Sequence, residues 1–344
     1  MSNSNPVFVT GGTGLIGAHI LSSLLEQGAT VRALKRPGSD LATVRKVIGY
    51  YHQDPEAVFS RIHWVDGSLN DPGSLAKAIG NARQVYHSAG MVSFDPRDRK
   101  SLFQANAGGT AAIVDYCLNA GVGKLCYISS AATLGKPSGV DSVAEKIHEE
   151  MPWNPSGEES DYALSKFEAE KEVWKGVDKG LNCVILNPTI VIGPGDWARS
   201  SSKLFGTIWK GFPFYSAGSN AFVDVRDVAR AALSLMDYSV SGERYVVMAE
   251  NHAFKQVFDW IAEYLGKKKP SVPVSPLLGE IAWRADWLQS RIKGKGPEIT
   301  RATLASARKQ YFFSNEKIVR QLDFSFIPIE ASIRETCRLF LQEH

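Results

Sequence analysis

A tyrosine and a lysine one helical turn apart, Tyr162 and Lys166, are the residues of this sequence best suited to acid–base chemistry. At positions i and i+4 of a helix, the two side chains lie on the same face. A free tyrosine has a pKa of about 10 and is a poor proton donor or acceptor at neutral pH. A neighbouring ammonium favours the phenolate and lowers that pKa, so such a pair can exchange a proton with an alcohol or a carbonyl oxygen.

The same spacing occurs at Tyr264 and Lys268, so spacing alone is a weak signal. That second pair spans Gly266, which places it at the fraying end of a helix. Tyr162 instead begins an uninterrupted helical stretch. We therefore assign the chemistry to Tyr162 and Lys166.

A serine, Ser130, directly follows an apolar strand predicted at residues 124–129. Its hydroxyl can hydrogen-bond a substrate oxygen and direct it toward Tyr162. Serine at the end of a strand is also commonly a turn residue, and this alternative stays open. The chemical role is favoured by the other motifs of the sequence, because a glycine-rich turn, Ser130, Tyr162 and Lys166 follow one another along the chain.

The glycine-rich turn occupies residues 10–17, between a short apolar strand and a helical stretch. Its first glycine would permit the tight turn, its second would let a pyrophosphate approach, and its third would let the helix pack on the sheet. The helix N-terminus would supply free N–H groups and a partial positive charge for the phosphates. A glycine-rich loop without a ligand is the alternative. The residues expected to bind a dinucleotide here are Gly11, Thr13, Gly14, Leu15, Ile16 and Gly17.

The end of the second predicted strand indicates which dinucleotide binds. NAD-binding proteins usually place an acid there to hold the ribose 2′-OH. This sequence has Lys35 and Arg36 instead, so Arg36, with Lys35 or Arg32, would pair with a 2′-phosphate. We expect NADP(H) to be preferred and NAD(H) to be possible, with a solvent-facing basic turn as the alternative. The positive nicotinamide ring of the oxidised cofactor would lower the pKa of Tyr162 further.

An acid, Asp66, follows the third predicted strand and precedes Gly67. Its carboxylate can accept a hydrogen bond from the adenine amino group, and we place both residues in the cofactor site. Asp66 could equally cap the helix that starts near Pro72.

Apolar strands and helical stretches alternate along the first half of the chain. Strands are predicted at 6–10, 30–34, 62–65, 84–88, 124–129 and 183–187, and helices at 15–27, 102–120 and 161–177. This alternation predicts an α/β fold: a Rossmann-type doubly wound parallel sheet with a smaller C-terminal α+β substrate lobe. We assign residues 1–187 with 222–242 to the dinucleotide-binding domain, and 188–221 with 243–344 to the lobe.

Composition narrows the function. The chain has 344 residues and a formal charge of +3, which is far too small to indicate a nucleic-acid partner. No apolar run approaches the roughly 20 residues that span a bilayer and no leader precedes the first strand, so a cytoplasmic location is expected. The four cysteines lack CxxC spacing and the seven histidines form no HxH or HExxH pair, so no metal site is expected.

On these segments the sequence resembles an extended short-chain dehydrogenase/reductase. More narrowly, it is similar to the dihydroflavonol-reductase-like part of the NAD-dependent epimerase/dehydratase branch, a neighbour of the 3β-hydroxysteroid dehydrogenases and nucleotide-sugar epimerases. The matching segments are residues 10–17, 31–36, 87–90, 106–110, 129–130, 162–166, 187–195 and 222–229.

The resemblance implies roles for particular residues. Ser130, Tyr162 and Lys166 would form the catalytic triad, and Lys166 would also hold the nicotinamide ribose. Arg36 falls where NADPH-using reductases of this branch keep an arginine. Asn106 would be a structural partner within its helix. Five further residues would line the cofactor, the last two beside the nicotinamide amide: Ser88, Ala89, Gly90, Pro188 and Thr189.

We expect NADPH-dependent reduction of a ketone or aldehyde on a small organic molecule, with the proton supplied by Tyr162. The alternatives are an NAD-retaining nucleotide-sugar epimerase or dehydratase, a 3β-hydroxysteroid-dehydrogenase-like oxidoreductase, and a protein that binds cofactor without turnover. Segments 134–157 and 196–220 match no substrate-specific pattern, so the substrate stays unnamed. The aromatic candidates for a pocket are Phe94, Trp197, Phe212, Phe214, Tyr215 and Phe222.

The expected partner is the small carbonyl or alcohol substrate, with no stable membrane insertion. The chain would be a monomer, or a homodimer paired through helices 102–120 and 161–177. An amphipathic stretch at 277–295 would cover the pocket or dock on a membrane or a partner.

Overall fold

The computed structural model describes residues 6–137, 145–155, 157, 159–275, 278–280, 283–284 and 307–344. Most of the amphipathic stretch 277–295 lies outside these residues, and its predicted role with it.

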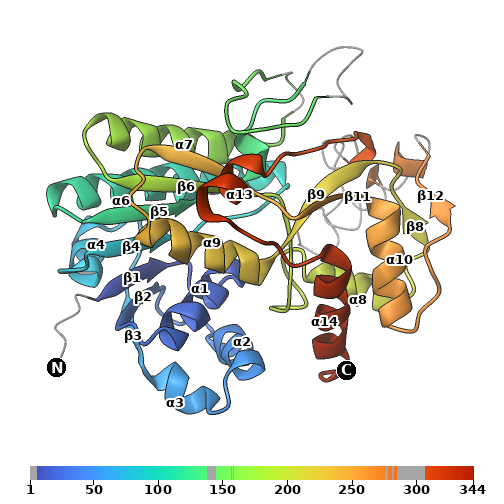
Figure 1. The fold of residues 1–344 in the computed structure, drawn as a ribbon, viewed down its shortest axis with the longest axis horizontal. Helices are drawn as coiled ribbons and strands as arrows, with labels where there is room; N and C mark the ends of the chain where they lie inside the picture. The colour runs from blue at the N-terminus through green and yellow to red at the C-terminus, as the bar shows by residue number, and fades with distance from the viewer. Residues whose placement is uncertain are drawn as a thin grey trace.

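A seven-stranded sheet, all of whose neighbouring strands run parallel, organises the larger part of the molecule (Figure 1). Its strand order is β3-β2-β1-β4-β5-β6-β10. The order reverses between β1 and β4, and ligands of such sheets bind at that point, outside the carboxyl ends of the strands. The strands are β1 (Val7–Thr10), β2 (Val31–Lys35), β3 (Ile62–Asp66), β4 (Gln84–His87), β5 (Lys124–Ile128), β6 (Cys183–Pro188) and β10 (Glu243–Val247).

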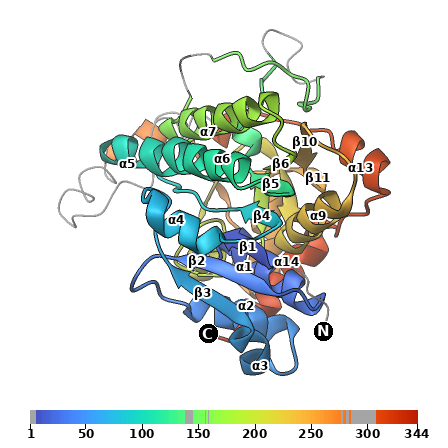
Figure 2. The same ribbon diagram turned by 90° about the vertical axis from the view of Figure 1, so that its left-hand side faces the viewer.

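Helices cover both faces of this sheet, as Figure 2 shows from the side. One face packs against α1 (Leu15–Glu26), α2 (Ala42–Tyr51) and α9 (Val225–Asp237). The other packs against α4 (Pro72–Ile79), α6 (Gly109–Asn119) and α7 (Asp161–Asp178). Because both faces are covered, β1, β5 and β6 are buried along their whole length and carry nearly continuous apolar side chains. The doubly wound parallel sheet predicted from the sequence is confirmed.

Shorter elements join these helices. They are α3 (Pro55–Ser60), η1 (Pro96–Asp98), α5 (Arg99–Phe103), the π-helical turn η2 (Gln104–Gly108) and the 3-10 turn η3 (Ala131–Thr133).

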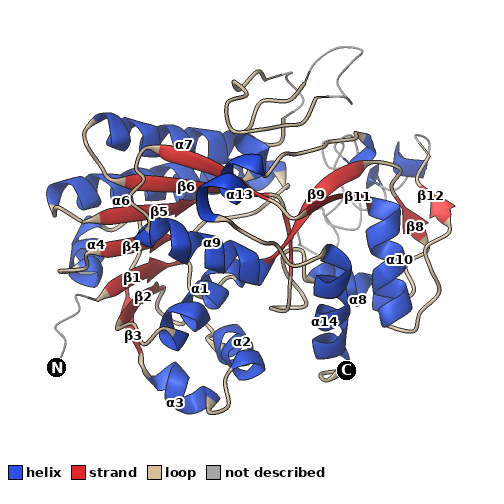
Figure 3. Ribbon diagram, viewed as in Figure 1, coloured by secondary structure: helices blue, strands red, loops and turns tan. Residues whose placement is uncertain are grey.

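A smaller lobe contains both helices and strands, which Figure 3 separates by colour. A three-stranded sheet of order β11-β9-β7 and a pair β12-β8 lie in it. Its core is apolar and packs α8, α10 and α14 against the strands. The elements are β7 (Ile190–Ile192), α8 (Lys203–Trp209), β8 (Phe214–Tyr215), β9 (Ser219–Asp224), β11 (Glu250–Ala253), α10 (Phe254–Tyr264), β12 (Val272–Pro273) and α14 (Ile329–Leu341). Helix α13 (Glu316–Leu322), although within residues assigned to the lobe, packs its buried Ile318 into the core of the large sheet beside β10.

Two strands lie in a different sheet from the one expected. Strand β10 pairs with β6 in the large sheet, although residues 243–344 were assigned to the lobe. Strand β9 pairs with β7 and β11 in the lobe, although its residues 222–224 were assigned to the large domain. Both errors arise because the apolar pattern of a sequence indicates which segments form strands, but not which strands pair with each other. Strand pairing depends on where the chain returns after it leaves the sheet. The other boundaries stay a prediction.

Candidate active site

Helix α7 presents Tyr162 near the carboxyl end of β5. The helix begins at Asp161 because Ser160 caps it, with Ser160 Oγ accepting from Ala163 N at 3.2 Å. The phenol of Tyr162 interacts with the hydroxyl of Ser130, which follows β5. Burial raises the pKa of Tyr162, and the Ser130 hydroxyl lowers it by a smaller amount. The phenol therefore holds its proton at neutral pH, and the lowered pKa expected from its lysine neighbour is wrong for this structure.

Lys166 lies one turn further along α7, is buried, and contacts β5. Its Nζ donates to Tyr127 Oη at 2.8 Å and to the carbonyl of the next residue at 2.9 Å. Burial lowers the pKa of Lys166 to about 7, and the charge of Glu170 opposes that change. The structure thus brings Ser130, Tyr162 and Lys166 together around the end of one strand.

A buried histidine, His87, connects this point to the first strand. Its Nδ1 lies 2.7 Å from Thr10 Oγ1, and its Nε2 lies 3.0 Å from Thr110 Oγ1. The ring also stacks on Tyr127, with centroids 5.5 Å apart. Burial lowers the pKa of His87 to about 3, so the imidazole is neutral near pH 7. The ends of β1, β4 and β5 are therefore held in register by an uncharged network.

The glycine-rich turn between β1 and α1 is shaped by close backbone approach. Gly11 has a φ of +71°, and a Cβ there would lie 2.5 Å from Ala89 N. A Cβ at Gly17 would lie 2.1 Å from Gly11 O. Gly14 differs, because it is exposed and a Cβ there would meet nothing closer than 3.4 Å. It caps α1 without any side-chain hydrogen bond to the first turn. The turn therefore offers open N–H groups at a helix N-terminus and fits a pyrophosphate.

Gly17→Ala and Gly14→Ala are expected to separate packing from binding. The methyl group at position 17 meets backbone, so we expect a loss of about 3 kcal/mol in the free energy of unfolding, measured with urea. At position 14 the loss should stay within about 1 kcal/mol. Dinucleotide affinity of Gly14→Ala, measured by calorimetry, should nevertheless fall about tenfold or more. Unchanged dinucleotide affinity in Gly14→Ala would show that the pyrophosphate does not bind at this turn.

Two of the three non-glycine residues expected to bind a dinucleotide in this turn, Leu15 and Ile16, are partly buried. Ile16 packs against the core beside α1, and a Cβ at Gly195 would lie 2.9 Å from Leu15 Cδ1. Thr13 is half-buried. Leu15 thus lies where the loop after β7 approaches the glycine-rich turn.

The three cations near the end of β2 have different surroundings. Arg32 Nη1 donates to the carbonyls of Ala78 and Ile79 at 3.3 and 3.4 Å. Lys35 forms an ion pair with Asp66 at the end of β3. The Arg36 side chain is exposed and has no hydrogen bond or ion pair to any residue that the structure describes. Of the three, Arg36 is the one whose guanidinium is available to a phosphate.

Asp66 does not cap α4. Asp71 holds that position, with its Oδ1 accepting from Gly73 N at 3.1 Å. Asp66 instead pairs with Lys35 and keeps a side chain that is 58% exposed. Gly67 N donates to Lys35 O at 2.9 Å, so this turn lies against the end of β2. The contact of Asp66 with adenine stays a prediction.

Asn106 ties the loop after β4 to α7. Its Nδ2 donates to Met91 O at 3.0 Å and to Ser165 Oγ at 2.9 Å, and its Oδ1 accepts from Met91 N at 2.7 Å. The expected role within its own helix is wrong, because these bonds cross to two other elements. The π-helical turn η2 carries this side chain. Asn106 thereby fixes the chain just after Ser88, Ala89 and Gly90.

Those three residues follow β4 directly and lie beside the glycine-rich turn. Ser88 N donates to Thr10 O at 3.3 Å, and Ala89 N donates to Thr10 Oγ1 at the same distance. On the other side of the sheet's centre, Pro188 ends β6 and Thr189 N donates to Val247 O at 3.2 Å. Their contact with a cofactor stays a prediction.

A family model described as the NAD dependent epimerase/dehydratase family matches residues 7–247. The chain belongs to this family. Sterol demethylase protein B of Methylococcus capsulatus is 32% identical over 290 residues, which are 82% of each chain. A putative dihydroflavonol 4-reductase of Synechocystis is 27% identical over 346 residues, or 98% of this chain and 94% of the relative.

Two solved structures have the same fold over nearly their whole length. The crystal structure of gox2253 superposes with a TM-score of 0.79 at 29% identity, covering 99% of both chains. The Bordetella bronchiseptica enzyme WbmH in complex with NAD⁺ superposes with a TM-score of 0.73 at 21% identity, covering 98% of this chain and 99% of that one. The epimerase/dehydratase family is one of enzymes that use a nicotinamide cofactor.

The aromatic residues expected to line a pocket of this family member divide into separate groups. Phe94 lies against the Tyr162 ring, with centroids 6.0 Å apart and an angle of 61°. Trp197 and Phe222 instead belong to the core of the lobe. Phe212 and Phe214 contact each other, and Tyr215 lies under the Lys255 ammonium. Of the six, Phe94 is the one in contact with the proposed catalytic tyrosine.

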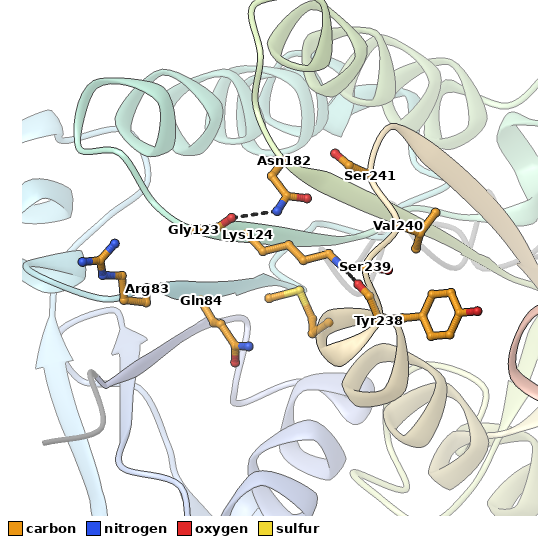
Figure 4. Close-up of a pocket in the computed structure, with 10 residues that line it drawn as sticks. Arg83, Gln84, Gly123, Lys124, Asn182, Tyr238, Ser239, Val240 and Ser241 are labelled. Carbon is orange, nitrogen blue, oxygen red and sulfur yellow. Dashed lines mark hydrogen bonds between the residues drawn. The ribbon is translucent and has the colours of Figure 1, made fainter. Parts of the chain in front are cut away.

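A cavity of about 500 Å³ lies at the opposite side of the large sheet, next to the amino ends of its central strands (Figure 4). Lys124 lines it, with Nζ donating to the carbonyls of Leu235 and Tyr238 where α9 ends. These bonds satisfy carbonyls that the helix leaves unpaired. Because doubly wound sheets bind ligands at their carboxyl edge, we give this cavity no part in the chemistry.

Sequence reasoning missed two buried residues of the site, Tyr127 and Glu170. Tyr127 contacts Lys166, and Glu170 lies one turn after Lys166 on the same helix. Two signals in the sequence could have indicated them. Tyr127 places a hydroxyl inside the apolar strand 124–128, and Glu170 is an acid at a buried position of helix 161–178.

Within the described ranges, no group of three or more His, Cys, Asp or Glu side chains is arranged to hold a metal ion. Among the helices the structure describes, none has both the length and the apolar character that crossing a bilayer requires.

Proposed function

We propose that this family member reduces a ketone or aldehyde group on a small apolar molecule, using NADPH. The observation that carries the proposal is the meeting of Tyr162, Ser130 and Lys166 beside the turn that fits a dinucleotide. The cofactor supplies the hydride when bound, and Tyr162 supplies the proton to the substrate oxygen.

Each residue has a distinct part in this chemistry. The Ser130 hydroxyl orients the substrate oxygen toward Tyr162. Lys166, whose pKa burial lowers to about 7, provides positive charge in its protonated form and a donor for the nicotinamide ribose. Because burial raises the pKa of Tyr162, the phenol is protonated at neutral pH. That is the form required for reduction, whereas oxidation of an alcohol requires the phenolate.

The preference for NADPH rests on Arg36. The ribose 2′-phosphate of NADPH carries negative charge, and the exposed Arg36 guanidinium has no partner among the described residues. Lys35 and Arg32 are already bonded to protein groups. NAD(H) is the alternative cofactor.

An apolar substrate is supported by the surface next to Tyr162. Val92 and Phe94, in the loop after β4, are 58% and 39% exposed. Exposed apolar side chains beside a reacting centre favour a ligand with apolar surface of its own. The names of the relatives, a sterol demethylase protein and a dihydroflavonol 4-reductase, agree with this class and favour a ring-bearing ketone.

The test begins with the purified protein and any cofactor that co-purifies with it. NADPH and NADH are then titrated by calorimetry, and turnover is measured with an aromatic aldehyde, a 3-ketosteroid and UDP-glucose. Exchangeable NADPH, weak NADH and turnover of one of the apolar carbonyls are the expected results. Retained NAD with conversion of UDP-glucose would replace this proposal with a nucleotide-sugar epimerase.

A further inference from the structure

Glu170 is a buried carboxylate that the proposed mechanism does not yet use. It is 2% exposed and lies on α7 one turn after Lys166. Burying a charge costs several kcal/mol unless other groups satisfy it. Its Oε1 accepts from Arg244 Nη1 at 3.0 Å and from Trp174 Nε1 at 3.4 Å. These two bonds satisfy only the side of the carboxylate that faces away from the reacting groups.

The other oxygen, Oε2, binds the chain on both sides of Ser130. Ser129 Oγ donates to it at 2.5 Å and Thr133 Oγ1 at 2.8 Å. Asn187 Nδ2 lies 2.9 Å from Oε2 and 3.1 Å from Ser130 O. One carboxylate oxygen therefore fixes the residues before and after Ser130, and the Asn187 amide that also holds the Ser130 carbonyl.

The negative charge of Glu170 also acts on Lys166 and raises the pKa of that ammonium. The ionisable groups that face Lys166 are Glu170 on its own helix, Tyr162 at the start of that helix, Tyr127 on β5 and His87 on β4. His87 is neutral near pH 7, because burial lowers its pKa to about 3. The described residues thus give Lys166 one negative neighbour at neutral pH. Arg244 lies on the far side of the carboxylate and offsets part of its charge.

We propose that Glu170 is a positioning residue for the reaction, which fixes Ser130 against Tyr162 and favours the charged form of Lys166. This inference rests on the proposed function, because the reaction is the one assigned to those residues. It differs from a purely structural role, in which Glu170 and Arg244 would only attach α7 to β10.

Two variants separate position from charge. Glu170→Gln keeps the length and removes the charge, and Glu170→Asp keeps the charge and shortens the reach. In Glu170→Gln the alkaline limb of kcat/KM should move about one pH unit toward acid, since Lys166 loses its negative neighbour. In Glu170→Asp that limb should stay in place, while kcat falls about tenfold or more with little change in KM, since Ser130 is no longer fixed.

The control is Glu168→Gln on the same helix, where the carboxylate is 42% exposed and pairs with Lys171. It should leave the profile unchanged. An unmoved alkaline limb in folded Glu170→Gln, with only its melting temperature lowered, would overturn the proposal and leave the structural role. Should Glu170→Gln fail to fold, the Glu170→Asp split between kcat and KM decides instead.

A readout without turnover separates this inference from the proposed function. The affinity for NADPH is measured by calorimetry from pH 6 to 9 in wild type and Glu170→Gln. Because Lys166 is proposed to hold the nicotinamide ribose, affinity should weaken as Lys166 loses its proton, and at lower pH in the variant. Absence of carbonyl reduction by the wild type counts against the proposed function. Coincident binding curves count against the role of Glu170.

Discussion

Replacing Tyr162 with phenylalanine is expected to lower kcat for carbonyl reduction by about a thousandfold. The variant removes the proton donor and keeps the ring that packs against Phe94. Lys166 keeps both of its hydrogen bonds, because its partners are Tyr127 and the carbonyl of Ile128. NADPH affinity should therefore stay within about threefold of wild type. Stopped-flow measurement of NADPH oxidation and calorimetry check the two parts.

The matched control is Tyr264→Phe. Tyr264 has the same spacing to Lys268 as Tyr162 has to Lys166, but it ends α10 and its hydroxyl donates to Glu330 Oε1 at 2.5 Å. Loss of that exposed bond should leave kcat unchanged. Activity of Tyr162→Phe within a few-fold of wild type would show that another group supplies the proton.

Replacing Arg36 with alanine is expected to weaken NADPH binding by about 10- to 100-fold and to leave NADH binding unchanged. A hydrogen bond between charged groups contributes about 1.5–3 kcal/mol, and NADH lacks the phosphate that would use it. The Arg36 side chain has no partner among the described residues, so the free energy of unfolding should not change. Calorimetric titration of both cofactors at one salt concentration measures the difference.

Arg61→Ala is the control for Arg36→Ala. Arg61 is also exposed but precedes β3, at the amino ends of the strands, whereas Arg36 follows β2 at their carboxyl ends. The charge change is the same, so any general electrostatic effect on an anionic ligand should appear in both variants. Equal losses of NADPH affinity in the two variants would show that the preference for NADPH comes from the overall charge of the protein and not from the Arg36 guanidinium.

The parts of the site that sequence predicted are those encoded locally. Tyr162 and Lys166 are one turn apart, so helical periodicity alone places them on one face. The glycine-rich turn is likewise one continuous segment. The close packing expected at Gly17 is confirmed, because a Cβ placed there would collide with the Gly11 carbonyl oxygen. The alternation of strands and helices predicted the large sheet, because buried parallel strands need long apolar runs.

The parts that sequence did not predict depend on contacts between distant segments. Glu170 contacts Ser129, Asn187 and Arg244, which come from three different strands or their ends. Helical spacing separates Glu170, one turn after Lys166, from the more exposed Glu168, but it does not identify the distant residues that Glu170 contacts. The capping of α4 by Asp71 rather than Asp66 was open for a related reason, since both acids precede the same helix.

A shortened chain that ends before β10 would leave β6 at the edge of the large sheet. Strand β6 is buried along its whole length, and an apolar edge invites pairing with other chains. In the complete sheet β10 takes that edge with Glu243 and Arg244, and Glu243 pairs with Lys317 of α13. During synthesis, the aggregation-prone edge is therefore covered only after the ribosome has passed residue 247. Attempts to exchange substrate lobes between relatives should keep β10 with the parent sheet.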